Sequence, residues 1–185
     1  MIVGHNPKSS PPPECLAEEK QKKSGDYKCG DVLERLKEDF RNKCYLCESK
    51  APNTINVEHF IPHRGDTDLK FDWANLFLSC GHCNNTKLAK PEYDHILNCT
   101  DPEHDVENRI RYEIKPFPKE KAHITALDEA AEVRNTVFLL EAVYNGTTPL
   151  KSIESENIRK NLLDEIIRFQ KLLYEFYHCT GQKIT

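Results

Sequence analysis

The chain has 185 residues, of which 38% are hydrophobic and 30% charged, and its formal net charge is −4. This length suits one ordinary domain, or a small module with a helical layer beside it, and the composition is typical of a globular protein with a modest core. No run of about 18 apolar residues occurs that would span a membrane, and residues 1–7 lack the apolar stretch of a secretion signal. We therefore expect a cytoplasmic protein that makes no membrane contact.

The first 26 residues are polar and contain three consecutive prolines, Pro11–Pro13. This composition predicts an extended arm, which is either disordered or laid across a partner. A helix is predicted to begin after Asp31, a residue type that caps helices, because apolar residues then recur at the spacing of one helix face. These apolar residues are Leu33, Leu36 and Phe40.

Two Cys-x-x-Cys pairs follow, Cys44/Cys47 and Cys80/Cys83, with 32 residues between them. Each two-residue gap lets both sulfurs of a pair face one ion, so the four thiolates are predicted to bind structural Zn²⁺. Two disulfides, a redox dithiol or coincidence among eight cysteines are the alternatives, and a reducing compartment favours zinc over disulfides. The remaining cysteines stand at no ligand spacing and are expected to be ordinary thiols: Cys15, Cys29, Cys99 and Cys179.

Between the two cysteine pairs, residues 54–60 alternate apolar and polar side chains and are rich in β-forming types. This pattern predicts a short strand, with Glu58 and His59 near its end. Pro62 and Gly65 then break the pattern and predict a loop.

A second apolar segment, residues 76–78, runs into the second cysteine pair. The polar residues 83–90 that follow are predicted to form a helix, which Pro91 ends. In that helix Asn84 and Lys87 are three residues apart and share a face. The order strand, loop, strand, helix predicts a small ββα unit.

Residues 98–105 are rich in turn formers, and residues 109–114 alternate like a strand. The polar residues of this loop resemble a metal cluster, but a solvated acidic turn is the favoured interpretation. They are Asp101, Glu103, His104 and Asp105.

The last third of the chain is predicted to be helical, with one helix over 126–143, a turn at 144–149 and a longer helix over 158–176. The second helix carries a wide apolar stripe, which we interpret as intramolecular core, with a face for another chain as the alternative. The stripe consists of Ile158, Leu162, Ile166, Phe169, Leu173 and Phe176, with Leu163, Ile167 and Leu172 beside it.

Taken together, the spaced motifs resemble the HNH endonuclease family, whose pattern is Cys-x-x-Cys, an acidic residue before His, a central Asn-Leu, and Cys-x-x-Cys-His/Asn-x-x-Lys. Glu58 stands where Asp is usual, and Asn84 stands where the final His is usual. Five spaced elements agree at once, which makes a fortuitous match untenable. The matching residues are Cys44/Cys47, Glu58-His59, Asn75-Leu76, Cys80/Cys83 and Asn84-x-x-Lys87.

The resemblance implies that His59 is the general base and that Asn75 braces the loop and orients His59. It also implies that Glu58 and Asn84 hold a catalytic divalent ion. Their oxygen ligands favour Mg²⁺ or Mn²⁺ over zinc at that position.

Three further side chains are weaker candidates for contact with the substrate: His63, Arg64 and Lys87. A solvated surface role is the default for such residues. His82 lies between the closing cysteines and is interpreted as filling the knuckle without a catalytic role.

Short flanking matches extend the resemblance to the small HNH proteins of Septu and retron-associated anti-phage systems. They lie at Val57–Pro62, Pro11–Pro13, Asp101–Asp105, Leu140 and Arg159. This likeness implies DNA as substrate and an ABC-type or SMC-like ATPase as partner. The net charge of −4 agrees with weak unaided DNA binding, because phosphate neutralisation supplies most non-specific affinity.

The sequence thus predicts an α+β fold, with a zinc-stapled ββα-metal (HNH) unit, flanking helices and a helical C-terminal region. The expected divisions are an arm over 1–26, the nuclease unit over 27–95 and a partner-binding region over 96–185. Two alternative functions remain: a stand-alone restriction or toxin-type nuclease, and a non-catalytic zinc-knuckle module that binds nucleic acid.

Overall fold

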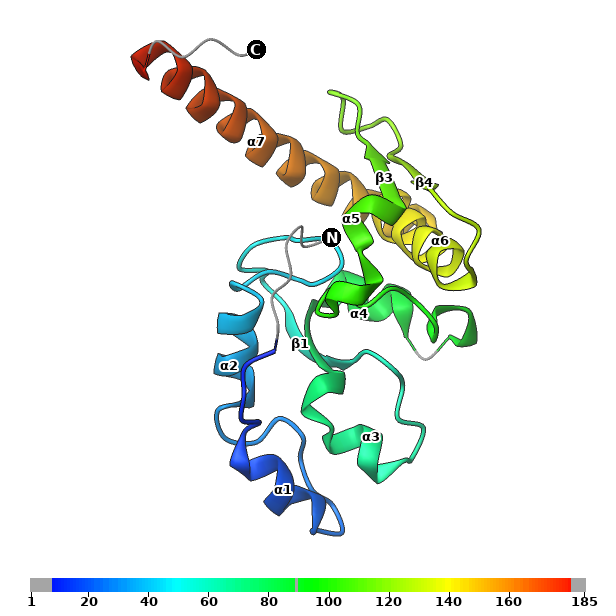
Figure 1. Cartoon of the computed structure of the whole chain (residues 1–185). Coiled ribbons are helices and arrows are strands. Elements are labelled where there is room, and N and C mark those ends of the chain that lie inside the picture. Colours follow the sequence, from blue (N-terminus) through cyan, green and yellow to red (C-terminus); the bar gives the residue numbers. More distant parts are fainter. Residues whose placement is uncertain (1–7, 89, 181–185) are drawn as a thin grey trace.

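The computed structural model describes residues 8–88 and 90–180, which form short helices, two small antiparallel sheets and one long helix (Figure 1). The mixture of helices with small sheets confirms the predicted α+β class. In the first half the elements are α1 (Glu14–Lys20), α2 (Val32–Asp39), β1 (Ile55–His59), α3 (Thr67–Phe71), the 3-10 helix η1 (Trp73–Asn75), β2 (Leu76–Cys80) and α4 (Gly81–Lys87). In the second half they are η2 (Pro91–Tyr93), η3 (Pro102–His104), α5 (Val106–Arg109), β3 (Ile110–Glu113), β4 (His123–Ala126), α6 (Ala131–Asn145) and α7 (Pro149–Thr180).

The predicted ββα unit is formed by β1, β2 and α4. The two strands pair antiparallel, with Ile55 opposite Cys80 and His59 opposite Leu76. Every residue of β2 is buried, because other elements cover both faces of this strand. Phe77 lies at the centre of an aromatic cluster, with its ring centroid 4.9 Å from that of Phe60 and 5.0 Å from that of Tyr45.

Part of the segment predicted to be an extended arm is helical. Helix α1 buries Leu16, and Cys15 forms a disulfide with Cys29. The expectation that these two cysteines are ordinary thiols is therefore wrong. A turn after α1 brings residues 14 positions apart into contact, and such a spacing carries no recognisable signature in the sequence. The division of the chain into an arm over 1–26, a nuclease unit over 27–95 and a partner-binding region over 96–185 stays a prediction.

A second sheet, β3 with β4, lies against α6. Its register pairs Ile110 with Ala126, so Ala126 belongs to a strand and the predicted helix begins only at Ala131. The side chain of Asn145 fastens the sheet to the end of α6, since it accepts from Ala122 N at 2.8 Å and donates to Ala122 O at 2.9 Å.

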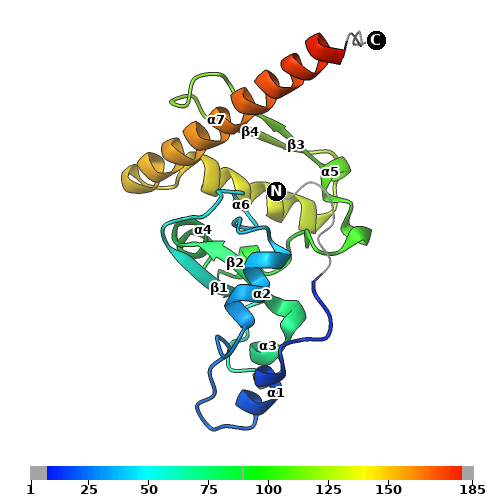
Figure 2. The same ribbon diagram turned by 90° about the vertical axis from the view of Figure 1, so that its left-hand side faces the viewer.

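Helix α7 is about 48 Å long and α6 about 22 Å, at 1.5 Å per residue for 32 and 15 residues. The longer helix therefore extends beyond its partner and projects from the body (Figure 2). Its apolar stripe is buried at Ile158 and largely exposed after Leu163, so the interpretation as intramolecular core is wrong for that half. The side chains of the distal face are 37–65% exposed: Ile166, Ile167, Phe169, Leu172, Leu173, Tyr174 and Phe176.

His82 connects the ββα unit to the C-terminal helices. Its Nδ1 lies 2.7 Å from Glu154 Oε2 of α7, and its Nε2 lies 2.9 Å from the carbonyl oxygen of Val143 in α6. The same carbonyl accepts from the Ser155 hydroxyl at 2.7 Å. His82 thus has a structural role in the knuckle. Within the described ranges, no helix has the length and apolar character needed to cross a membrane.

Arg159 is expected to hold α7 on the body. Its buried guanidinium donates to Pro118 O at 2.7 Å and to Tyr144 O. Replacement by methionine leaves two carbonyls without this donor and should lower the free energy of unfolding by about 3 kcal/mol. Denaturant titration in the presence of zinc measures this change, and Lys160→Met, at the exposed neighbouring position, is the control. Equal stability of both variants would contradict the assigned role.

Candidate active site and metal centre

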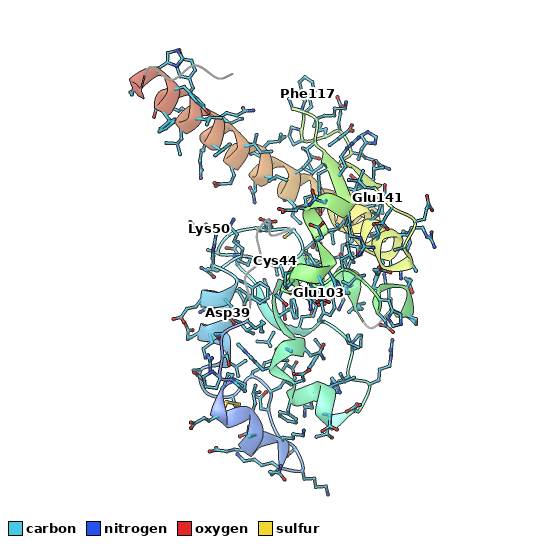
Figure 3. The ribbon with its side chains drawn as sticks, in the orientation of Figure 1. Asp39, Cys44, Lys50, Glu103, Phe117 and Glu141 are labelled. Atoms are coloured by element: carbon cyan, nitrogen blue, oxygen red, sulfur yellow. A yellow bond between two sulfur atoms is a disulfide. The ribbon has the colours of Figure 1, made fainter. Side chains whose placement is uncertain are left out.

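The four predicted zinc ligands are brought together in the interior. The sulfur atoms of Cys44, Cys47, Cys80 and Cys83 all lie within 4.8 Å of one another, and all four residues are buried. Figure 3 places Cys44 in the middle of the molecule. In the described part of the chain this is the one cluster of three or more His, Cys, Asp or Glu side chains suited to a metal, so the acidic loop at 101–105 does not form one.

The chemistry of this cluster suits a cation. Burial raises the pKa of the Cys83 thiol well above its ordinary value, and a neighbouring positive charge would stabilise the thiolate form there. Four sulfur donors around one centre suit tetrahedral zinc. An ion would join the turn after α2 to the first turn of α4. The Tyr144 hydroxyl extends this junction to α6 by donating to Cys47 O at 3.2 Å.

His59 is the last residue of β1, and its imidazole is half-buried. Its Nε2 lies 3.0 Å from the backbone oxygen of Lys70 in α3. A carbonyl oxygen only accepts, so we assign the proton to Nε2, which leaves the lone pair on Nδ1. No described group hydrogen-bonds to Nδ1. Burial lowers the pKa of His59, and the neutral form with a free basic nitrogen therefore dominates at pH 7.

Asn75 connects the chain segments on both sides of this histidine. Its Oδ1 accepts from Ile61 N at 2.7 Å, and its Nδ2 donates to Ile61 O at 2.9 Å and to Leu69 O at 3.0 Å. These bonds hold the loop after β1 against α3. Asn75 therefore braces the loop through backbone groups, beside the carbonyl that contacts His59.

Glu58 is buried, and its two carboxylate oxygens differ. Oε1 accepts from the Tyr45 hydroxyl at 3.1 Å and pairs with Lys87 Nζ at 2.9 Å. Oε2 is buried and has no hydrogen-bond partner among the described residues. Such an oxygen costs free energy unless a ligand satisfies it.

Lys87 does not match the predicted contact with substrate. Its side chain is 1% exposed, and its ammonium donates to His59 O at 3.0 Å and to Phe60 O at 2.7 Å, besides pairing with Glu58. Lys87 shares a helix face with Asn84, but this does not expose its side chain, because α4 packs against β1 on the side that carries Lys87. We correct its role to a structural one.

One pocket of about 390 Å³ is lined by five of the seven residues predicted to serve catalysis, the catalytic metal or the substrate. The ring of His63 lies 4.8 Å from that of His59, and the His63 Nδ1 accepts from Gly65 N at 3.1 Å. Arg64 is half-exposed and pairs with Asp94 at 2.6 Å. The lining residues are Glu58, His59, Pro62, His63, Arg64, Asn84 and Leu88.

This pocket fits a divalent cation. The unpaired oxygen of Glu58 and the side-chain amide of Asn84 are hard oxygen donors at one opening, the type that Mg²⁺ and Mn²⁺ prefer. Sequence reasoning missed the Lys70 carbonyl, the Tyr45 hydroxyl and the ring of Tyr27, which lies 4.5 Å from His59. No sequence signal marks these groups, since each reaches the site only through tertiary contacts.

We expect the purified chain to contain one zinc ion per molecule. Cys44→Ser and Cys80→Ser should each lose the ion and most of the cooperative thermal transition, because metal binding contributes directly to folding. Elemental analysis and circular dichroism melts measure both effects, and the exposed Cys179→Ser is the control. A metal-free chain with an unchanged melting transition would contradict the assignment.

Comparison with known proteins agrees with this geometry. Residues 44–90 match the HNH endonuclease family model. The chain is also 38% identical over 55 residues to Septu protein PtuB of Bacillus thuringiensis, a match that covers 28% of this chain and 21% of that protein. The match thus spans about a fifth of the relative's length, and no solved structure matches. Residues 44–90, which hold the four cysteines, β1, β2 and α4, are therefore an HNH endonuclease domain.

Proposed function

We propose that this chain is a metal-dependent endonuclease that hydrolyses phosphodiester bonds in DNA, with His59 as its general base. One observation carries the proposal. The imidazole of His59, with Nε2 3.0 Å from the Lys70 carbonyl oxygen and no described hydrogen bond at Nδ1, shares a pocket with Glu58 and Asn84.

His59 would take the proton from a water molecule that attacks phosphorus, as a base with a pKa below its ordinary value can do at neutral pH. The Lys70 carbonyl keeps the proton on Nε2 and so keeps Nδ1 available. Asn75 hydrogen-bonds to Ile61, near His59, and to Leu69, next to Lys70. These bonds limit the movement of His59 and of the Lys70 carbonyl relative to each other.

Glu58 and Asn84 would hold the divalent ion. A bound Mg²⁺ or Mn²⁺ neutralises charge on the phosphate and stabilises the leaving 3′ oxygen. Glu58 is prepared for this role, since Tyr45 and Lys87 hold Oε1 and leave Oε2 unpaired. Arg64 and His63, at the same pocket, are the proposed contacts to the phosphodiester backbone.

We also propose that the nuclease works in an anti-phage defence complex with an ATPase partner. The likeness to Septu protein PtuB supports a defence role, and the net charge of −4 supports a partner that brings the DNA. The ATPase itself is implied by the family resemblance described above.

The distal face of α7 is the proposed partner surface. Its main apolar positions, from Leu162 to Phe176, alternate in steps of four and three, the spacing of a helix that packs along a second helix. Its side chains are exposed aromatic and aliphatic groups, the types that are enriched in the buried centre of protein–protein interfaces. Polar residues occupy the opposite face: Asp164, Arg168, Lys171 and Glu175.

His59→Ala should reduce plasmid cleavage in Mg²⁺ or Mn²⁺ by about 10²- to 10⁴-fold, the usual contribution of a general base. The assay follows conversion of supercoiled DNA by gel, with zinc content confirmed for each protein. His123→Ala is the matched control, because His123 is exposed on β4 and does not line the pocket.

Equal cleavage by wild type and His59→Ala would refute the assignment of the base. Cleavage by the wild-type chain alone, independent of an ATPase, would favour the stand-alone nuclease. Retained DNA binding with no cleavage in any complex would favour the non-catalytic knuckle module.

Co-purification tests the partner surface. Tagged wild-type chain from the native host should bring down a protein that hydrolyses ATP, and the double variant Phe169→Asp/Leu173→Asp should lose it. Two buried charges at the centre of an apolar contact are enough to abolish such an interface.

Lys171→Asp, on the polar face of the same helical turns, is the control and should keep the ATPase. Light scattering adds a separate criterion. A stable dimer of the isolated chain that the double variant dissociates would assign this face to a second copy and overturn the ATPase surface.

A further inference from the structure

The imidazole of His59 lies between two other rings. The centroid of the Tyr27 ring is 4.5 Å from it at an interplanar angle of 59°, and that of His63 is 4.8 Å away at 60°. The backbone carbonyl of Lys70, in α3, accepts a hydrogen bond from Nε2 of His59. These contacts leave the ring little rotational freedom, although Tyr27 precedes the nuclease domain by 17 residues.

Tyr27 belongs to a closed loop, residues 14–30, which we name the N-terminal clasp. The Cys15–Cys29 disulfide closes it. Gly30 has a φ of +49°, and a Cβ there would lie 3.0 Å from the Cys15 sulfur. At Gly25 a Cβ would lie 1.9 Å from the backbone oxygen of Glu19, so only glycine permits this return of the chain.

The clasp also contacts α3, the element that supplies the Lys70 carbonyl. Lys20 pairs with Asp68 at 2.6 Å, and the Lys70 ammonium donates to Gly25 O at 2.7 Å. Lys70 thus contacts the clasp through its side chain and His59 through its backbone. Two of the groups that orient the imidazole, the Tyr27 ring and the Lys70 carbonyl, are therefore both tied to the clasp.

We propose that Tyr27 is a positioning residue for His59 and that the Cys15–Cys29 disulfide holds it in place. The inference rests on the proposed role of His59 as general base. The Tyr27 ring covers one side of the imidazole, selects one rotamer and so keeps Nδ1 directed for proton transfer. The contact is made by the ring, because no described hydrogen bond involves the Tyr27 hydroxyl.

Opening the disulfide should weaken this positioning. A phosphine reductant becomes its oxide, and water supplies the oxygen and the two protons that convert the S–S bond into two thiols. The clasp then loses its covalent closure, and Tyr27 and Gly25 can move away from the site. Cys44, Cys47, Cys80 and Cys83 form no disulfide, so the phosphine has no S–S bond to reduce there.

Steady-state cleavage is the first test. Tyr27→Ala should lower kcat about tenfold at unchanged KM for DNA, since a misdirected base slows proton transfer without changing substrate contacts. Tyr27→Phe keeps the ring and should restore kcat. Loss of kcat in both variants, or in neither, would overturn the proposal.

The second test does not depend on cleavage. Proton NMR resolves the signals of the His59 ring, which are assigned by their absence from the spectrum of His59→Ala. The ring current of a neighbouring aromatic side chain shifts the resonance frequencies of these protons. Tyr27→Ala should move them, and Tyr27→Phe should leave them nearly in place. If the wild-type chain cuts no DNA, these spectra still test the clasp, so failure of the proposed function and failure of this inference remain distinct.

Phosphine treatment is the third test. It should lower kcat and move the His59 signals as Tyr27→Ala does, while Cys15→Ser/Cys29→Ser should show both changes beforehand and no further response. Cys179→Ser should respond like wild type, and zinc content should stay constant throughout. A wild-type enzyme with unchanged kcat and spectra after complete reduction would overturn the role of the disulfide.

Discussion

The buried ammonium of Lys87 is the interaction on which the site depends. It has three donors, and three oxygens receive them: Glu58 Oε1, His59 O and Phe60 O. A buried charge is tolerated only when it is paired in this way. The consequence is geometric, because α4 is fixed against the end of β1 where Glu58 and His59 stand. The same pairing occupies one oxygen of Glu58 and leaves the other without a hydrogen-bond partner among the described residues.

The surrounding fold explains why so small a sheet can hold a site. A two-stranded sheet is marginally stable alone. Here β2 is wholly buried, four cysteines gather at its end, and His82 and Tyr144 join this region to α6 and α7. Support therefore comes from the cysteine cluster and from polar bonds as well as from apolar packing. This agrees with the modest hydrophobic content of the chain.

Two segments outside the nuclease domain, the N-terminal clasp and helix α7, lie at different distances from the pocket. The N-terminal clasp contacts His59 directly through Tyr27 and indirectly through its hydrogen bond to Lys70 of α3. Helix α7 instead carries its apolar face away from the pocket, beyond the end of α6. In the function that we propose, this arrangement separates the positioning of His59 from the attachment of a partner at α7.

Local pattern was enough to predict the order β1, β2, α4 and the cysteine cluster, because spacing within a short closed unit leaves few arrangements. The family resemblance implied that Glu58, His59 and Asn84 share a site, and all three line one pocket. It was not enough for Lys87, whose burial depends on how α4 packs, or for Cys15 and Cys29, which meet only through a tertiary turn. Ala126 has the spacing of a helix residue, but pairing with Ile110 places it in a strand. The sequence likewise determined that α7 is amphipathic. Only the tertiary structure decided that its distal face is exposed, since that depends on the length of α6 and no local pattern encodes the length of a neighbouring element.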